Sequence, residues 1–331
     1  MKTYLKNKTT TVGMVLVLCM VLAGVLAPLI APHSPYTQIL DYSNKPPGFK
    51  GEVVLYRLGL GLPVCTVAIK SMLVLDNTVD CVDTFNRHVI IDKNKLLGEK
   101  REDWHKRICF FLGSDNLGRD ILSRVLYGIR ISLFVGFFSS MISLFVGVTL
   151  GALAGYYGGI IEMIIMRITD VMYGFPILLF LIAITTAFEP SLIIVFCSIG
   201  FVSWPGMARV TRGQVKQVKE NEFVKATKVL GFKKSRTLWK HIVPNSLTPV
   251  LVMYALSVSG AIMAESSLSF LGLGAQPPVP SLGSMINAGI DFVTISPWIS
   301  IAPGFVIASI VFGFNMFSDG LKSSIDPITK K

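Results

Sequence analysis

Long apolar runs alternate with polar segments along most of this chain. A helix needs about 20 mostly apolar residues to cross a bilayer. Six segments meet this requirement, and they are residues 12–32, 131–156, 164–187, 191–208, 246–271 and 297–317. The pattern predicts an all-α integral membrane protein with six transmembrane helices. Only 15% of the residues are charged and the mean hydropathy is +0.61, which is too apolar for a soluble fold of 331 residues.

A long polar segment, residues 33–112, separates the first two apolar runs. Weakly alternating stretches around Val53 and Val64 predict short strands there, so we expect an insert with some β-structure. Residues 113–130 then have helical periodicity and predict an amphipathic helix lying at the membrane interface.

Two acids and two arginines stand close together at the start of this predicted interfacial helix. They are Asp115, Arg119, Asp120 and Arg124. Such a group could form a catalytic cluster. Ion pairs and helix capping at a membrane surface are the favoured interpretation.

Basic residues indicate how the chain is oriented in the membrane. Between Arg209 and His241 ten basic residues stand against two acids, a local charge of +8. Lysines also precede the first span and end the chain. Because lysine and arginine collect on the cytoplasmic side, we expect residues 1–11, the loop 209–245 and residues 318–331 in the cytoplasm, and the insert outside. The net charge of +11 is then no sign of nucleic-acid binding. A cleaved signal peptide is the alternative for the first run.

The basic loop itself contains a helical pattern. Phe223, Ala226 and Leu230 stand at i, i+3 and i+7, which predicts a short amphipathic helix over 221–230 that Gly231 would end. We expect Ser235 to cap a second short helix, and Pro244 to stop it. Two helices around a glycine make a compact knob, and an exposed apolar edge on it would need a partner. A polybasic segment lying on anionic lipid is the alternative.

Small and charged residues inside the spans suggest contacts between helices. Gly147, Gly151 and Gly155 form a stripe at i, i+4 and i+8, which lets another helix approach closely. Arg167 and Asp170 are expected to pair at i, i+3, and Pro176 is expected to bend their helix. Glu265 stands alone in an apolar run. It should face a cavity or a polar neighbour, so all three charged residues are candidates for bracing helices or lining a translocation path.

Cysteine and histidine patterns give no sign of a metal or a catalytic site. Cys65, Cys81 and Cys109 lie in the insert, and a disulfide between two of them stays open because it requires an oxidising compartment. The four histidines lack ligand spacing, and no His-Glu-x-x-His occurs. We therefore expect neither a metal site nor hydrolase chemistry.

Several separated motifs resemble one transporter family. The positions Lys225-Ala226-Thr227, Gly231 and His241–Pro244 resemble the coupling motif of ABC-importer permeases, which reads Glu-Ala-Ala, three residues, Gly, nine residues, Ile-x-Leu-Pro. The dipeptide/oligopeptide/nickel branch is similar in further segments, which are residues 113–124, 268–274, 280–285 and 315–327. The resemblance covers the N-terminal span and about 110–327, and it is strongest to the second permease subunit of such systems.

The chain also departs from that family pattern. Lys225 and Thr227 replace the usual Glu and second Ala, which puts the electrostatics of the ATPase contact in doubt. Four replacements occur near the C-terminus, at Ser318, Lys322, Ser323 and Ile325. Residues 40–110 have no counterpart in the pattern.

The resemblance implies a six-helix type I ABC importer permease in a bacterial cytoplasmic (inner) membrane, forming half of a path for peptides. It implies a homologous second permease, two ABC ATPase subunits and an extracytoplasmic substrate-binding protein as partners, besides the lipid bilayer. This chain lacks the phosphate-binding Gly-x-x-x-x-Gly-Lys-Ser/Thr motif, so ATP and Mg would be used by the ATPases. The coupling residues implied are Glu222, Phe223, Lys225, Ala226, Thr227, Leu230, Gly231, His241 and Pro244.

The solute stays open among dipeptides, oligopeptides, nickel chelates and related molecules. The alternative from another class is a secondary transporter driven by an ion gradient. Such folds often have repeated halves and paired carboxylates at mid-membrane, and neither is evident here.

Overall fold

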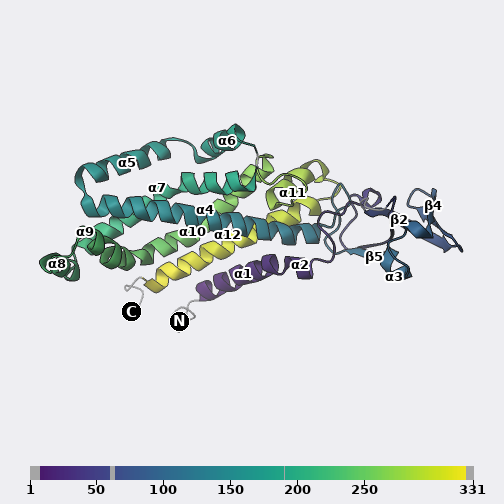
Figure 1. Ribbon diagram of the computed structural model, residues 1–331, viewed down its shortest axis with the longest axis horizontal. Coiled ribbons are helices and arrows are strands. Elements are labelled where there is room, and N and C mark those ends of the chain that lie inside the picture. Colours follow the sequence, from purple (N-terminus) through teal and green to yellow (C-terminus); the bar gives the residue numbers. More distant parts are fainter. Residues whose placement is uncertain (1–7, 60–63, 190, 326–331) are drawn as a thin grey trace.

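A computed structural model describes residues 8–59, 64–189 and 191–325. An elongated helical bundle carries a small β-sheet at one end and the short helix α8 at the other (Figure 1). We refer to these as the sheet end and the α8 end. The first seven residues and residues 326–331, which include Asp326, Pro327 and the terminal lysines, lie outside the described residues.

The helices account for most of the chain. The α-helices are α1 (Lys8–Val25), α2 (Ala27–Ile30), α3 (Arg101–Trp104), α4 (Ile121–Tyr157), α5 (Gly159–Gly174), α6 (Ile177–Ala187), α7 (Leu192–Lys219), α8 (Glu222–Val229), α9 (Lys234–Arg236), α10 (Val243–Phe270), α11 (Leu282–Gly289) and α12 (Trp298–Ile325). Short 3-10 turns are η2 (Leu40–Tyr42), η3 (Lys93–Lys95) and η5 (Ile290–Phe292), and η4 (Thr237–Ile242) is π-helical.

Four helical stretches in the described part are long and apolar enough to cross a membrane alone. They are Ile121–Tyr157, Leu192–Lys219, Lys234–Phe270 and Trp298–Ser323. The predicted third span is broken instead, because α5 and α6 meet at an angle of 88°. Pro176 follows the break and lacks the N–H that would continue the helix. The apolar part of α1, Thr10–Val25, is shorter than these spans.

The helix expected over 113–130 differs from the structure. One uninterrupted helix, α4, begins at Ile121 and includes the predicted second span, so no separate interfacial helix is present there. Helix α4 continues through Gly128, where an added Cβ would come within 2.8 Å of the Leu282 side chain. Asp120 caps α4 by accepting a hydrogen bond from the N–H of Ser123 (3.0 Å).

The predicted cytoplasmic loop 209–245 is also shorter in the structure. Helix α7 continues to Lys219, and Lys234–Phe270 is one helical stretch. Likewise α12 extends to Ile325, so the first part of the expected C-terminal tail is helical. Amphipathic helices extend past the bilayer when polar ends pack on their neighbours, which hydropathy alone does not reveal.

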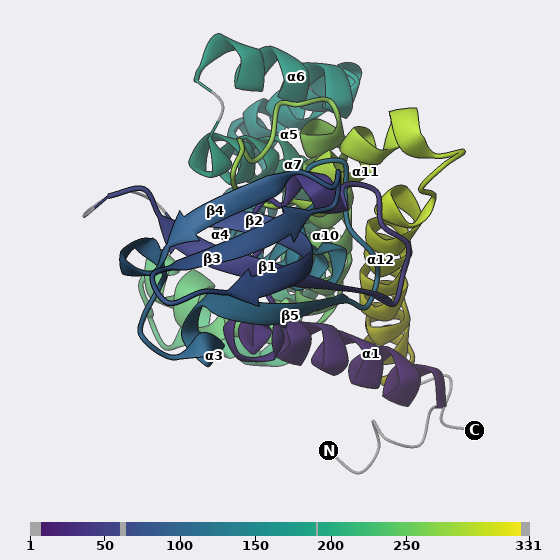
Figure 2. The same cartoon turned by 90° about the vertical axis from the view of Figure 1, so that its right-hand side faces the viewer.

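The insert forms a five-stranded antiparallel sheet in the order β4-β3-β2-β1-β5. Its strands are β1 (Phe49–Arg57), β2 (Val64–Val74), β3 (Thr78–Asp83), β4 (His88–Asp92) and β5 (His105–Phe110). Figure 2 views this sheet from its own end of the molecule, with the helices behind it. Val53 and Val54 are both buried, in separate clusters, because successive strand residues face opposite sides. Trp104 belongs to one cluster and Tyr42 to the other, so both faces are covered.

The three cysteines of the insert, all within the described residues, form no disulfide. Cys65 and Cys109 lie on opposite sides of β1, opposite Tyr56 and Lys50 respectively. Six residues of strand separate these positions, about 20 Å at roughly 3.3 Å per residue, which is too far for a disulfide. Cys81 is fully buried on β3, and burial raises the pKa of its thiol to about 11.

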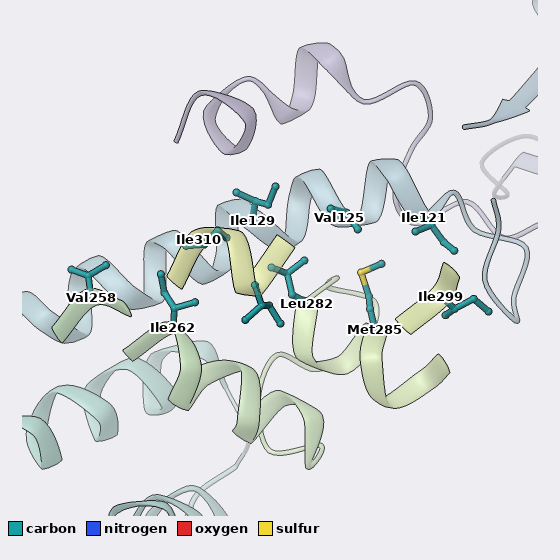
Figure 3. Close-up of a cluster of buried hydrophobic side chains, with 10 residues drawn as sticks. Ile121, Val125, Ile129, Val258, Ile262, Leu282, Met285, Ile299 and Ile310 are labelled. Atoms are coloured by element: carbon teal, nitrogen blue, oxygen red, sulfur yellow. The ribbon is translucent and has the colours of Figure 1, made fainter. Parts of the chain in front are cut away.

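The bundle core near the sheet end joins α4, α10, α11 and α12. Figure 3 shows aliphatic side chains from these helices converging on one region. The fully buried members include Ile121, Ile262 and Leu282. This core fixes the helices to which both ends of the molecule are attached.

Candidate functional site

Helix α8 forms the tip of the molecule opposite the sheet (Figure 1). Glu222 stands in its first turn, where an acid favours the helix dipole. Gly231 follows its end with φ +72°, a left-handed conformation that favours glycine. The N–H of Phe232 then donates to the carbonyl of Thr227 (3.0 Å), which closes the helix end. The structure therefore has a short helix ended by Gly231, as the local pattern predicted.

The inner face of α8 is anchored in a hydrophobic cluster. Val224 is fully buried, and Thr227 is also buried. The cluster around Val224 contains Ala152, Tyr156, Val215, Val218, Leu238, Ile242 and Val243. These residues come from α4, α7, η4 and α10, so α8 is packed against three of the long helical stretches. Val224 and Thr227 stand at i, i+3, a spacing that could have indicated the buried face.

The outer face of α8 exposes large apolar side chains. Phe223 is 42%, Leu230 70% and Val229 88% exposed. Ala226 is exposed beside them. The apolar edge predicted from Phe223, Ala226 and Leu230 is thus the uncovered one. Exposed apolar patches of this kind commonly mark interaction sites.

Cations surround this apolar edge. Lys225 bonds Glu222 (2.9 Å), and both side chains are exposed. The neighbouring exposed cations are Lys233, Lys234, Arg236 and Lys240. The guanidinium of Arg236 lies 4.6 Å from the ring centre of Phe232. The edge and its cations together form a surface suited to an acidic partner with an apolar groove.

Pro244 does not stop a helix, which corrects the prediction. It lies in the first turn of α10, directly after the π-helical segment η4. A proline cannot donate to the carbonyl four residues earlier, and its ring clashes with that group in a regular α-helix. The wider π-helical turn accommodates the ring, so the helix continues. The side chain of Asn245 donates to the carbonyl of His241 (2.6 Å), which satisfies one backbone group there.

The predicted cap at Ser235 is likewise absent. Lys233 occupies the N-cap of α9, and no side chain caps this helix. His241 is partly buried in η4, and its ring lies 5.8 Å from that of Phe232. Phe232 therefore contacts both a cation and an aromatic ring across the turn between α8 and η4.

Three further basic residues of the predicted loop lie on α7 and contact α5. Arg209 pairs with Asp170 (2.6 Å), and its guanidinium lies 4.3 Å from the ring centre of Tyr173. Arg212 and Lys216 both pair with Glu162. The predicted Arg167–Asp170 pair is therefore wrong, because Asp170 bonds an arginine on the neighbouring helix that an aromatic ring also holds. Arg167 itself is exposed on α5.

The glycine stripe of α4 lies against α7. A Cβ added to Gly147 would come within 2.5 Å of the Met207 Cβ, and one added to Gly155 within 2.8 Å of the Arg212 carbonyl oxygen. At Gly151 an added Cβ would collide with the Ala208 carbonyl. The two helices approach at all three positions too closely for a side chain.

Glu265 is buried between α10 and α4. Its carboxylate accepts hydrogen bonds from Ser269 (2.7 Å) on its own helix and from Ser132 (2.9 Å) on α4. The side chain has no exposed surface. The arrangement links two spans through hydroxyl groups, as expected for a buried polar residue.

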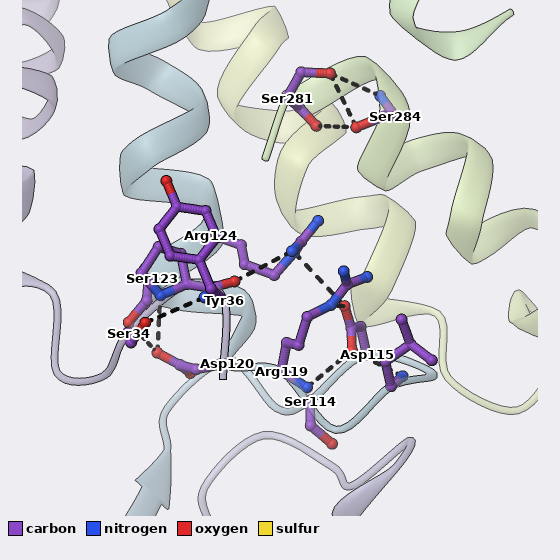
Figure 4. Close-up of polar contacts among 12 residues, drawn as sticks. Ser34, Tyr36, Ser114, Asp115, Arg119, Asp120, Ser123, Arg124, Ser281 and Ser284 are labelled. Carbon is purple, nitrogen blue, oxygen red and sulfur yellow. Dashed lines mark hydrogen bonds and ion pairs between the residues drawn. The ribbon is translucent and has the colours of Figure 1, made fainter. Parts of the chain in front are cut away.

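The segment 113–124, which we call the polar hub, lies at the sheet end. Figure 4 shows Arg119 and Arg124 converging on Asp115. Arg119 reaches the carboxylate at 2.7 Å and Arg124 at 3.6 Å, and all three side chains are nearly buried. Asp115 also accepts the backbone N–H groups of Leu117 and Arg119 (both 2.9 Å). The interpretation as ion pairs and helix capping is confirmed by these bonds.

The hub ties distant segments together. Arg124 donates to the carbonyl of Pro35 (3.2 Å), and the Ser114 hydroxyl donates to that of Tyr42 (2.5 Å). Trp298 at the start of α12 donates to the Ser114 carbonyl (3.2 Å). Trp298 could not be predicted in this role from local patterns, since 184 residues separate the two partners. No cluster of three or more His, Cys, Asp or Glu side chains suited to a metal occurs within the described ranges.

The chain matches two families. Residues 147–331 match the family described as "binding-protein-dependent transport system inner membrane component". Residues 1–47 match the "N-terminal TM domain of oligopeptide transport permease C".

Individual relatives agree with these matches. The dipeptide transport system permease protein DppC of Alkalihalophilus pseudofirmus is 43% identical over 237 residues, 72% of this chain and 76% of that protein. DppC of Bacillus subtilis is 34% identical over 323 residues, 97% and 82% of the two chains. The oligopeptide permease OppC of Bacillus subtilis is 38% identical over 250 residues, 75% and 80%.

The chain is therefore an integral membrane permease of the ABC class. It belongs to the family of inner membrane components of binding-protein-dependent transport systems, and its relatives are permease subunits of peptide transporters. The Bacillus subtilis DppC match spans 97% of this chain. The comparisons give no support to a gradient-driven transporter.

Proposed function

We propose that this chain is one permease subunit of an ATP-driven peptide importer, and that α8 is the helix through which ATPase subunits drive it. The observation that carries the proposal is the exposed apolar edge of α8, surrounded by cations and anchored through Val224 to three long helical stretches. A force applied to this helix would reach α4, α7 and α10 together, because tightly packed elements move as units.

The proposed orientation follows from charge. The α8 end faces the cytoplasm together with both termini, and the sheet end lies outside, where a substrate-binding protein would deliver peptide. A six-helix type I arrangement follows if α1 and the bent α5–α6 pair each cross the bilayer. A homologous second permease would complete the path, and two ATPases would bind ATP and Mg. This chain would bind neither.

We propose structural roles for the charged residues within the spans. Glu265 braces α4 to α10, and Asp170 braces α5 to α7 through Arg209. The glycine stripe holds α4 against α7 next to the cluster that anchors α8. The coupling surface is the outer face of α8 with its neighbouring cations, and His241 and Pro244 shape its base.

Purification from the native membrane tests this function. The tagged chain, gently solubilised, should carry a second permease and ABC ATPases, identified by mass spectrometry. After reconstitution with the binding protein, vesicles should accumulate labelled dipeptide only with ATP. A homo-oligomer without any ATPase would contradict the proposal and would favour a gradient-driven transporter. Uptake in vesicles that lack anionic lipid distinguishes ATPase docking by the basic surface from lipid binding by it, because only a lipid-binding role requires such lipid.

A further inference from the structure

Two buried threonines connect α8 to the base of α10. The Oγ1 atoms of Thr227 and Thr237 lie 3.2 Å apart. Thr227 is 6% exposed and Thr237 1% exposed. Thr227 belongs to α8, and Thr237 is the first residue of η4, which continues directly into α10.

The direction of this hydrogen bond follows from its neighbours. The Thr227 hydroxyl donates to the carbonyl of Val224 (2.7 Å) within its own helix. A hydroxyl has one hydrogen to donate, so the Thr227 oxygen is left as an acceptor. Thr237 must therefore be the donor between the two helices. Each hydroxyl is satisfied in a place where an unpaired one would be costly.

The covalent connection between α8 and the helical stretch Lys234–Phe270, which includes η4, is a short turn. Gly231 in this turn has φ +72°, and an added Cβ there would meet no atom within 4 Å. A turn with a glycine in open space can pivot, so it cannot by itself hold α8 at a constant angle to α10. The packing of Val224 and the threonine bond are among the contacts that resist such a pivot.

We propose that Thr227 and Thr237 are positioning residues that make α8 and the base of α10 move as one body. The inference rests on the proposed function, since it describes how motion at α8 reaches the spans. A hydrogen bond is directional, so it resists rotation of α8 about its axis, whereas packing of a single valine does not. The motif that this segment resembles has alanine at the position of Thr227, and an alanine could not accept the bond.

The test compares substitutions that remove the hydroxyl but keep the shape. Thr237→Val and Thr227→Val should each lower the number of peptides transported per ATP hydrolysed by about 2- to 10-fold, the range expected for losing one hydrogen bond. ATPase subunits should still co-purify. The double variant should be no worse than Thr227→Val alone, because the bond between the two helices is already lost there together with the bond from Thr227 to Val224. Thr237→Ser keeps the hydroxyl and should restore most of the ratio.

Thr185→Val is the matched control. Thr185 is fully buried, and its hydroxyl donates to the Leu181 carbonyl (2.9 Å) within α6. It should leave the transport ratio unchanged. If wild-type vesicles show no ATP-driven uptake, the proposed function fails and this inference fails with it. A wild-type ratio in Thr237→Val, additive losses in the double variant, or equal losses in Thr237→Ser and Thr237→Val would each overturn the threonine link while leaving the proposed function intact.

Discussion

The two ends of the bundle differ in which side chains they bury. In the polar hub, Asp115 is almost completely buried and is satisfied by two arginines and two backbone N–H groups. At the tip of α8, Leu230 and Val229 stand largely in solvent although both are apolar. The hub is complete within this chain. The outer face of α8 is not, because nothing in the described chain covers it.

This difference distinguishes residues that stabilise the fold from residues that bind a partner. Buried charges are retained where each has its partners, and a broken buried pair is strongly destabilising. An exposed apolar edge contributes little to folding and gains its energy only when a partner buries it. Substitutions at the hub should therefore change stability, and substitutions on the outer face of α8 should change assembly alone.

The largest effect is expected at the centre of the hub. Asp115→Ala would leave Arg119 and Arg124 buried without their carboxylate, a loss of about 3–5 kcal/mol. The midpoint of thermal unfolding in detergent should drop steeply. Asp92→Ala is the control, because its pair with Lys95 is exposed and should contribute little. Equal unfolding midpoints for Asp115→Ala and Asp92→Ala would contradict the stabilising role of the hub.

A second buried acid should behave like Asp115, but less strongly. Glu265→Ala removes the acceptor of the Ser132 and Ser269 hydroxyls, which should cost about 1–3 kcal/mol. Glu265→Gln keeps an acceptor oxygen and should retain most of the stability. Uptake that falls in Glu265→Gln while its unfolding midpoint stays at the wild-type value would indicate a path-lining role rather than a brace.

The outer face of α8 should give the opposite result. Leu230→Ser should leave the unfolding midpoint unchanged and weaken ATPase binding about 10-fold or more, as for an interface residue worth over 1 kcal/mol. Co-purification at graded detergent and salt concentrations measures this. Leu73→Ser is the control, since Leu73 is 61% exposed on β2 at the other end. ATPase recovery that is equal in both variants would argue against docking at α8.

The smallest effect concerns pH and the sheet. Hydrogen bonds from His105 and then Arg107 hold the pKa of Glu52 below its ordinary value. A depressed carboxyl pKa stabilises the folded state above the unfolded pKa of about 4.3, and this contribution disappears as pH falls through the folded pKa. Wild type should therefore lose slightly more thermal stability than Glu52→Gln between pH 6 and pH 3. The difference should be small because Glu52 is partly exposed. Parallel profiles would contradict it.

Local patterns predicted those features that neighbouring residues decide. The helix ended by Gly231 is correct because helical period and a left-handed glycine act within a few residues. The break at Pro176 has the same origin. Pro244 was misread because its effect depends on whether the preceding turn can widen, and η4 shows that it does. The prediction for Asp170 is wrong because Arg209, 39 positions away in the sequence, bonds it in place of Arg167, which is three positions away.

Composition and the spacing of residues along single helices are enough to predict the membrane character, the long apolar helices and the amphipathic period of α8. The packing of elements distant in the sequence determines which face of α8 is buried, which arginines bond Asp115, and that Thr237 donates to Thr227. These contacts join segments that are far apart in the sequence, and sequence separation does not predict distance in space. Several residues could make each contact on chemical grounds, and the packing of whole helices selects one of them.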